Sequence, residues 1–109
     1  MTTDSNINND IVETISNPIF NTVDELQEYL NNCGYEDTVF LKNPSFVKAI
    51  TGISSRGQLI YDYNLMIPAA MEEENWDFED ATEWIEYNTI RSIPYMGDFQ
   101  PIISFPIEW

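Results

Sequence analysis

The sequence predicts an α+β fold in which a small antiparallel sheet packs against two or three helices. Three features predict it: a capped amphipathic segment at 23–32, two apolar segments joined by a turn at 46–63, and a second capped segment at 77–94. The chain has 109 residues, of which 43% are hydrophobic, so one core is expected. We therefore expect a polar N-terminal arm at 1–20, partly disordered, and a single α+β domain at 21–109.

The first predicted helix covers about residues 23–32. Thr22 and Glu25 have the spacing of a capping box, in which side chains bind the free backbone N–H groups at a helix start. Gly34 supplies a residue that can adopt positive φ after the helix ends. Apolar residues at helical spacing form the packing face: Val23, Leu26, Tyr29 and Leu30.

The predicted sheet is built on a hairpin. Residues 46–53 and 58–63 are expected to pair as antiparallel strands around the loop at 54–57, where Gly57 can take positive φ. Residues 38–41 are also β-prone. A further β-prone segment, 102–105, lies between two prolines that confine it to an edge of the sheet.

A second helix is predicted between the hairpin and the acidic residues 72–74. Pro68 is tolerated in a first turn and damaging deeper in a helix, so we expect this helix to start near residue 65 or to be kinked. Glu72, Glu73 and Glu74 would close it, although acids at a helix C-terminus oppose the helix dipole. Their presence there suggests another use for the charge.

The segment from Asp77 to Pro94 predicts the best-formed helix. Asp77 is a favourable N-cap and Pro94 is expected to end the helix. Glu79, Glu83 and Glu86 share one exposed face at spacings of four and three residues. The opposite face is expected to be buried: Phe78, Ala81, Trp84, Ile85 and Ile90.

The charge balance is extreme, with 19 acidic residues, 4 basic ones and a net charge of −15. Such a surface repels nucleic acid and anionic membranes and attracts basic proteins, including those that hold DNA or RNA. Between residues 62 and 86 there is no Lys or Arg to form the usual helical ion pairs. Nine acids lie there, and these are the predicted partner-binding residues: Asp62, Glu72, Glu73, Glu74, Asp77, Glu79, Asp80, Glu83 and Glu86.

This acidic run suggests a nucleic-acid mimic. Carboxylates one helical turn apart are separated by about 5–6 Å, on the same scale as successive phosphates of one DNA strand. The hypothesis is that the row occupies the nucleic-acid channel of a basic, nucleic-acid-binding host protein, in the host cytoplasm. An acidic regulatory protein that binds without mimicry is an alternative, and salt-insensitive binding through the aromatic residues would favour it.

Catalytic motifs are poorly represented. The chain has no His and a single Cys, Cys33, so neither a Ser-His nor a Cys-His pair can form, and no phosphate-binding loop is present. We therefore expect no catalytic residue, no cofactor and no metal. The enzymatic alternative is a metal-dependent, carboxylate-based enzyme that uses Asp77, Glu79, Asp80 and Glu83. No signal peptide is visible at the N-terminus.

A resemblance covers roughly the C-terminal two-thirds of the chain. The segments that carry it are Asn43-Pro44-Ser45-Phe46, the hairpin through Gly57 to Tyr61-Asp62-Tyr63, the block Glu83 to Tyr95 (EWIEYNTIRSIPY), and Pro101-Ile102-Ile103. In them the chain resembles small acidic proteins encoded by phages and mobile elements of low-GC Gram-positive bacteria. It departs from them at 67–70, where a more regular acidic helix is expected, and at Ser92, where Ala is more usual.

The resemblance implies a phage-borne accessory protein. Small acidic proteins of that origin include anti-CRISPR and anti-restriction inhibitors, several of which imitate nucleic acid. No catalytic residue is implied. Within the block, Arg91 is expected to pair with Glu83 or Glu86 or to cap carbonyls near the helix end; the alternative is that it joins an interaction surface with Tyr87 and Tyr95.

Overall fold

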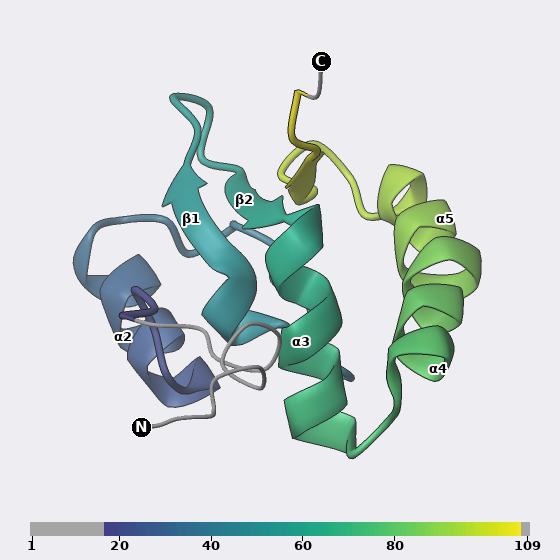
Figure 1. Ribbon diagram of the computed structural model, residues 1–109. Helices are drawn as coiled ribbons and strands as arrows, with labels where there is room; N and C mark the ends of the chain where they lie inside the picture. Colours follow the sequence, from purple (N-terminus) through teal and green to yellow (C-terminus); the bar gives the residue numbers. More distant parts are fainter. Residues whose placement is uncertain (1–16, 108–109) are drawn as a thin grey trace.

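A computed structural model describes residues 17–107 and confirms the α+β fold (Figure 1). The larger part of the predicted N-terminal arm, residues 1–16, lies outside the described residues. Figure 1 shows α2 beside β1 at one end of the molecule, α3 beside the sheet, and the α4–η2–α5 helix at the other end. The elements, in chain order, are α2 (Val23–Asn32), η1 (Val47–Ala49), β1 (Ile50–Ile53), β2 (Leu59–Asp62), α3 (Tyr63–Glu74), α4 (Phe78–Trp84), η2 (Ile85–Thr89), α5 (Ile90–Ser92), η3 (Ile93–Tyr95) and β3 (Ile102–Ser104).

The start of α2 is capped as the sequence predicts. The Glu25 backbone N–H donates to Thr22 Oγ1 at 3.2 Å, and the Asn21 N–H donates to Glu25 Oε1 at 2.8 Å. Gly34, with φ 81°, follows the helix. These bonds satisfy donors that a helix start leaves open, and the apolar face of α2 then packs into the core through Leu26 and Leu30.

The sheet differs from the prediction in the direction of one strand, β3. β1 and β2 form the predicted antiparallel hairpin, with an irregular register between Ile50 and Gly52. β3 pairs with β2 in parallel, Ile60 opposite Ile102 and Asp62 opposite Ser104, so the sheet is mixed, in the order β1-β2-β3. The reason is the connection: α3, α4 and α5 intervene between β2 and β3, and a crossover of this length allows the chain to return in the same direction.

Two predicted β segments are not strands. Residues 38–41 form an irregular segment fixed by single bonds, in which the Val39 N–H donates to the Phe99 carbonyl and the Leu41 N–H donates to the Tyr61 hydroxyl at 3.1 Å. Residues 47–49 are the 3₁₀ turn η1 rather than part of a strand, and Phe46, the residue before it, has φ 52°. This left-handed backbone interrupts any extended segment, and it is held in place by hydrogen bonds that Ser45 and Phe46 donate to Glu73 at the end of α3.

Helix α3 begins at Tyr63, slightly before residue 65, the start that was one of the two expectations. Asp62 is its N-cap, since Asp62 Oδ1 accepts from the Leu65 N–H at 3.1 Å, and the helix runs from Tyr63 to Glu74 with Pro68 inside it. A proline at 68 removes the hydrogen bond to the carbonyl of Asn64, four residues earlier. Asn64 is exposed, so water can satisfy that carbonyl. The core lies between α2, the sheet, α3 and α4, and its most deeply buried large side chains include Tyr61, Phe46, Leu26, Leu59, Met66 and Ile85.

The helix predicted at 77–94 is present but is not regular. Asp77 caps it by accepting from the Asp80 N–H at 2.8 Å, and the helical backbone then passes through the π-helical segment η2. The α-helix ends at Ser92, just before Pro94 as expected, and the 3₁₀ turn η3 then continues to Tyr95.

The buried face of this helix is narrower than predicted. Ala81 and Ile85 are buried, but Phe78 is 60% exposed. Helical side chains lean toward the preceding turn, and Phe78 is the first helical residue, so it has no preceding turn to cover. Trp84 is 38% exposed and packs against Trp76, with 5.3 Å between ring centroids.

Candidate acidic interaction surface

The three acids that close α3 have different environments. The Lys48 ammonium donates to Glu72 Oε1 at 3.0 Å. The carboxylate of Glu73 accepts from the Ser45 N–H at 2.9 and 3.1 Å, from Ser45 Oγ at 3.1 Å and from the Phe46 N–H at 3.3 Å. The side chain of Glu74 makes no hydrogen bond or ion pair within residues 17–107. Two of the three therefore fasten the end of α3 to the 45–48 segment.

Three further acids of the predicted row also have partners within the protein. Asp62 and Asp77 are the N-caps of α3 and α4. Glu86 accepts a short hydrogen bond, 2.6 Å, from the hydroxyl of Tyr63. Four exposed acids remain that make no side-chain hydrogen bond or ion pair within residues 17–107, and we call these the open carboxylates: Glu74, Glu79, Asp80 and Glu83.

The row predicted along one helix face is therefore shorter than expected. Glu79 and Glu83 lie one turn apart on α4 and are both exposed. Glu86 lies in η2, and its bond to Tyr63 directs its carboxylate toward the start of α3. Sequence spacing could not show this, because Tyr63 is 23 residues away along the chain.

The environment of Tyr63 changes its acidity. Desolvation, and then the hydrogen bond to Glu86 and its negative charge, raise the pKa of Tyr63 to about 12 from the usual 10.0. Burial likewise raises the pKa of Tyr61 above its usual value, opposed by the hydrogen bond from the Leu41 N–H. In both cases the fold favours the neutral phenol over the phenolate.

We expect this preference to appear as a loss of stability in alkali. A raised pKa means that the stabilising contribution is complete below pH about 10 and is lost as the pH rises toward about 12. Tyr63→Phe should remove one late-titrating group from the tyrosinate absorbance curve and lessen the alkaline loss of stability. Glu86→Gln, which keeps an acceptor and removes the charge, should move the Tyr63 titration to lower pH. Loss of a group that titrates near pH 10 in Tyr63→Phe, or an unchanged curve for Glu86→Gln, would contradict this assignment.

Aromatic side chains border the open carboxylates. One hollow, of ≈ 510 Å³, lies on the side of α4 where Trp84 packs against Trp76. It is lined by Trp76, Asp80, Glu83, Trp84, Tyr87 and Asn88. A second, of ≈ 670 Å³, follows the outer side of the same helix and is lined by Phe78, Glu79, Thr82, Glu83, Glu86, Tyr87, Ile90 and Arg91. Glu83 and Tyr87 border both hollows.

Arg91 does not form the ion pair that the sequence suggested as one alternative. The one ion pair found among residues 17–107 is Lys48–Glu72, and the guanidinium of Arg91 instead lies over the ring of Tyr87, 5.0 Å from its centroid. Tyr87 is 58% exposed and Tyr95 is 89% exposed. Tyr87, which lines both hollows, thus belongs to the surface beside the open carboxylates.

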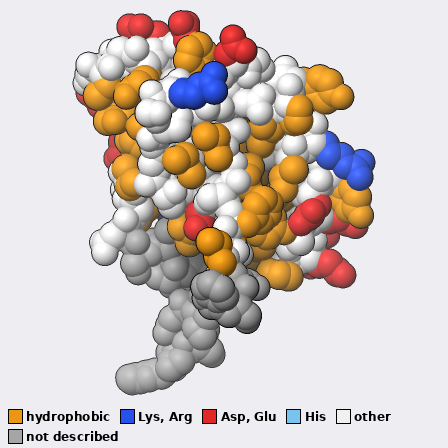
Figure 2. All heavy atoms as spheres, turned by 90° about the horizontal axis from the view of Figure 1, so that it is seen from above, with side chains coloured by type: hydrophobic (Ala, Val, Ile, Leu, Met, Phe, Trp, Pro, Cys, Tyr) orange, Lys and Arg blue, Asp and Glu red, His pale blue; other side chains and the backbone are white. Residues whose placement is uncertain are grey.

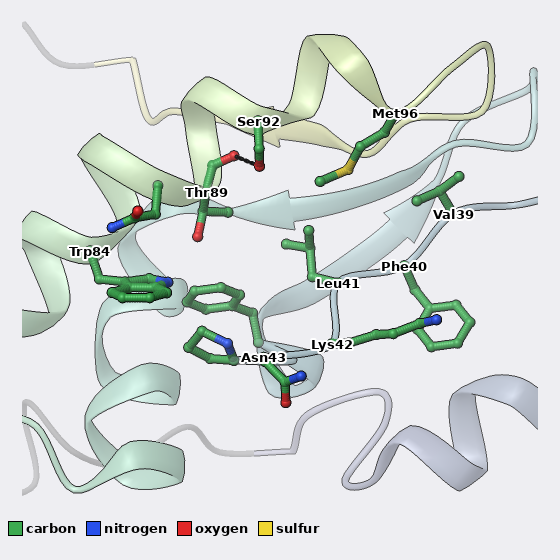
Figure 3. A pocket seen from close by; sticks show the side chains of 12 residues that line it. Val39, Phe40, Leu41, Lys42, Asn43, Trp84, Thr89, Ser92 and Met96 are labelled. Atoms are coloured by element: carbon green, nitrogen blue, oxygen red, sulfur yellow. Dashed lines mark hydrogen bonds between the residues drawn. The ribbon is translucent and has the colours of Figure 1, made fainter.

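A separate groove of ≈ 370 Å³ lies between the irregular segment 39–44 and the α4–η2–α5 helix (Figure 3). Trp84 and Leu41 lie on opposite sides of it, and Met96 lies at one end (Figure 3). The Lys42 ammonium lies 5.5 Å from the centre of the Phe40 ring. Sequence reasoning missed this groove, because residues 39–44 were expected to be part strand and part turn, and Trp84 was expected to be buried.

The acidic character is not uniform over the molecule. Seen from above the view of Figure 1, hydrophobic side chains gather over the middle of the face and acidic side chains lie mostly at its edges (Figure 2). This face carries the hairpin loop and the end of the α5 helix (Figure 1). The open carboxylates instead belong to the end of α3 and to α4.

Comparisons with known proteins do not assign the surface. No protein-family model, no curated protein and no solved structure matches this chain. Within residues 17–107, no three or more Asp, Glu or Cys side chains form a group that could hold a metal ion. The four acids of the enzymatic alternative, Asp77, Glu79, Asp80 and Glu83, therefore do not form such a group. The side chain of Asp77 instead caps α4. None of the helices described is long and apolar enough to cross a membrane.

Proposed function

We propose that this protein is a non-enzymatic binding protein that inhibits a basic, nucleic-acid-binding partner by occupying its nucleic-acid site. The observation that carries the proposal is the set of open carboxylates: Glu74, Glu79, Asp80 and Glu83 are exposed, lie around the turn between α3 and α4, and have no cation partner among residues 17–107. In a chain of net charge −15, such groups repel one another until a basic surface neutralises them.

The mimicry is confined to a small part of the predicted row. Glu79 and Glu83 are one turn apart, at about the 5–6 Å that separates such side chains on a helix, which is the scale of successive phosphates. Asp80 and Glu74 extend the negative surface on either side of this pair. Five other acids of the row already hold caps or tertiary contacts: Asp62, Glu72, Glu73, Asp77 and Glu86.

The class of partner follows from charge and from the resemblance to small acidic phage proteins. A partner with Lys and Arg side chains arranged for a phosphate backbone complements these carboxylates and meets them fast at low salt. Among the proteins that a phage accessory protein encounters in the host cytoplasm, host defence nucleases such as CRISPR effectors carry such sites. We therefore place the protein among inhibitors of host defence.

A capture experiment tests this function. The immobilised protein is incubated with lysate of a low-GC Gram-positive bacterium over a salt series, and bound proteins are eluted with duplex DNA. We expect basic, nucleic-acid-binding proteins that bind at low salt, leave as salt rises, and are displaced by DNA. If nothing of that class binds at low salt, or if captured proteins keep their nucleic acid while bound, the proposal is wrong.

A further inference from the structure

The outer hollow beside α4 combines two kinds of side chain that bind the same chemical group. Phe78 and Tyr87 are 60% and 58% exposed, and both line it. Glu79 and Glu83 line it as well and are two of the open carboxylates. Exposed aromatic rings beside carboxylates are unusual in a surface built only for solubility, because rings do not improve hydration.

The protein itself shows which group this hollow accepts. The guanidinium of Arg91 lies 5.0 Å from the centroid of the Tyr87 ring, within the range of a cation–π interaction. Arg91 makes no ion pair with a carboxylate of the described chain, although Glu83 and Glu86 line the same hollow. An internal arginine thus uses the ring and leaves the carboxylates for a second cation.

The chemistry of the hollow favours arginine over lysine. A guanidinium is planar, stacks on aromatic faces and donates two parallel hydrogen bonds to a carboxylate, whereas an ammonium is a compact and strongly hydrated point charge. Aromatic rings at the centre of an interface, with charges around them, are also the usual composition of binding hot spots.

We propose that this hollow is the centre of the contact and that it takes an arginine side chain of the partner, which packs on Tyr87 in place of Arg91 and pairs with Glu83 or Glu79. The proposal rests on the proposed function, because a basic partner must be attracted first. It adds the recognised group, a guanidinium, and it gives Arg91 a role as an internal competitor for the Tyr87 ring.

Peptide binding tests the inference without knowledge of the partner. The probes are a short helical peptide with arginines one turn apart, the same peptide with lysines, and a neutral peptide with glutamines, measured by calorimetry at low and at moderate salt. We expect the arginine peptide to bind about tenfold more tightly than the lysine peptide. Tyr87→Ala should abolish that preference, while Tyr87→Phe and the control Tyr95→Ala, at an even more exposed tyrosine outside the hollow, should keep it.

A second measurement compares two arginine variants in their affinity for the arginine peptide. Arg91→Ala and Arg56→Ala remove the same charge, but Arg56 lies in the hairpin loop. If Arg91 covers the site, Arg91→Ala should raise the affinity for the arginine peptide about threefold or more beyond the gain from Arg56→Ala.

The outcomes separate the two proposals. Equal binding of arginine and lysine peptides, unaffected by Tyr87→Ala, or equal gains from the two arginine variants, would refute the inference and leave the proposed function standing. Binding of neither basic peptide above the neutral one at low salt would remove the electrostatic basis of the proposed function itself.

Discussion

Glu73→Ala is expected to lower the free energy of unfolding by about 2–4 kcal/mol, whereas Glu74→Ala should change it by less than about 0.5 kcal/mol. The two residues are neighbours with the same charge and both are exposed. They differ in their partners. Glu73 accepts from the N–H groups of Ser45 and Phe46, residues only 4% and 1% exposed, and truncation leaves those donors without an acceptor.

The backbone at Phe46 increases the expected effect. Phe46 has φ 52°, a conformation that costs an L-residue about 1–2 kcal/mol, and its ring is among the most deeply buried side chains. The Glu73 carboxylate supports this turn from the end of α3. We therefore expect Phe46 to lose part of its packing when Glu73 is removed, and η1 to lose its fixed position against α3.

Urea unfolding followed by far-ultraviolet circular dichroism measures both variants. Glu73→Gln should fall between them, because the amide oxygen still accepts one or two bonds but carries no charge. Since Glu74→Ala removes the same charge, it controls for relief of repulsion in a chain of net charge −15. Equal stabilities of the Glu73 and Glu74 variants would show that the contacts to Ser45 and Phe46 contribute nothing.

Local signals predicted the elements whose causes are local. Thr22 and Glu25 lie within one turn of each other and form the capping box that their spacing indicates, and Asp77 caps α4 as predicted. Gly57, with φ 82°, makes the hairpin loop in the same way. The parallel direction of β3 depends instead on the long connection through α3, α4 and α5. The left-handed turn at Phe46 depends on Glu73, which is 27 residues away along the chain.

The sequence predicted the negative charge of the candidate site, but it could not predict which of its carboxylates have partners within the protein. The absence of Lys and Arg between 62 and 86 is visible in the sequence, and it marks the acidic region along the chain. Which acids are open depends on tertiary partners, since Lys48 pairs with Glu72 and Tyr63 binds Glu86. The exposure of Phe78 was missed because helical periodicity assigns a residue to a face without regard to its place at a helix start.

Reversal of three open carboxylates should abolish binding of a basic partner while the fold survives. Glu79→Lys, Asp80→Lys and Glu83→Lys together replace attraction by repulsion, and we expect the affinity for the arginine peptide to fall by about a hundredfold or more at 0.1 M salt. Each reversal raises the net charge by two, so the net charge changes from −15 to −9. Lower self-repulsion offsets the loss of favourable acids at the start of α4, each worth about 0.3–1 kcal/mol.

A matched variant separates position from total charge. Asp24→Lys, Glu28→Lys and Glu36→Lys change the net charge equally, and they also remove an acid from the first turn of a helix, α2. All three are exposed, and α2 lies at the opposite end of the molecule from α4 (Figure 1). Since exposed charges farther apart than about 10 Å are largely screened at 0.1 M salt, we expect this control to weaken binding less than about tenfold.

Comparing the two triple variants distinguishes a local binding site from an effect of the total negative charge. If both triple variants lose affinity equally, the partner responds to net charge, and the open carboxylates have no special role. If only the α4 variant loses affinity and both keep the thermal stability of the parent, the acidic run is a binding surface. In that case the five acids held by caps and tertiary contacts build the end of α3 and the start of α4, and the four open ones meet the partner.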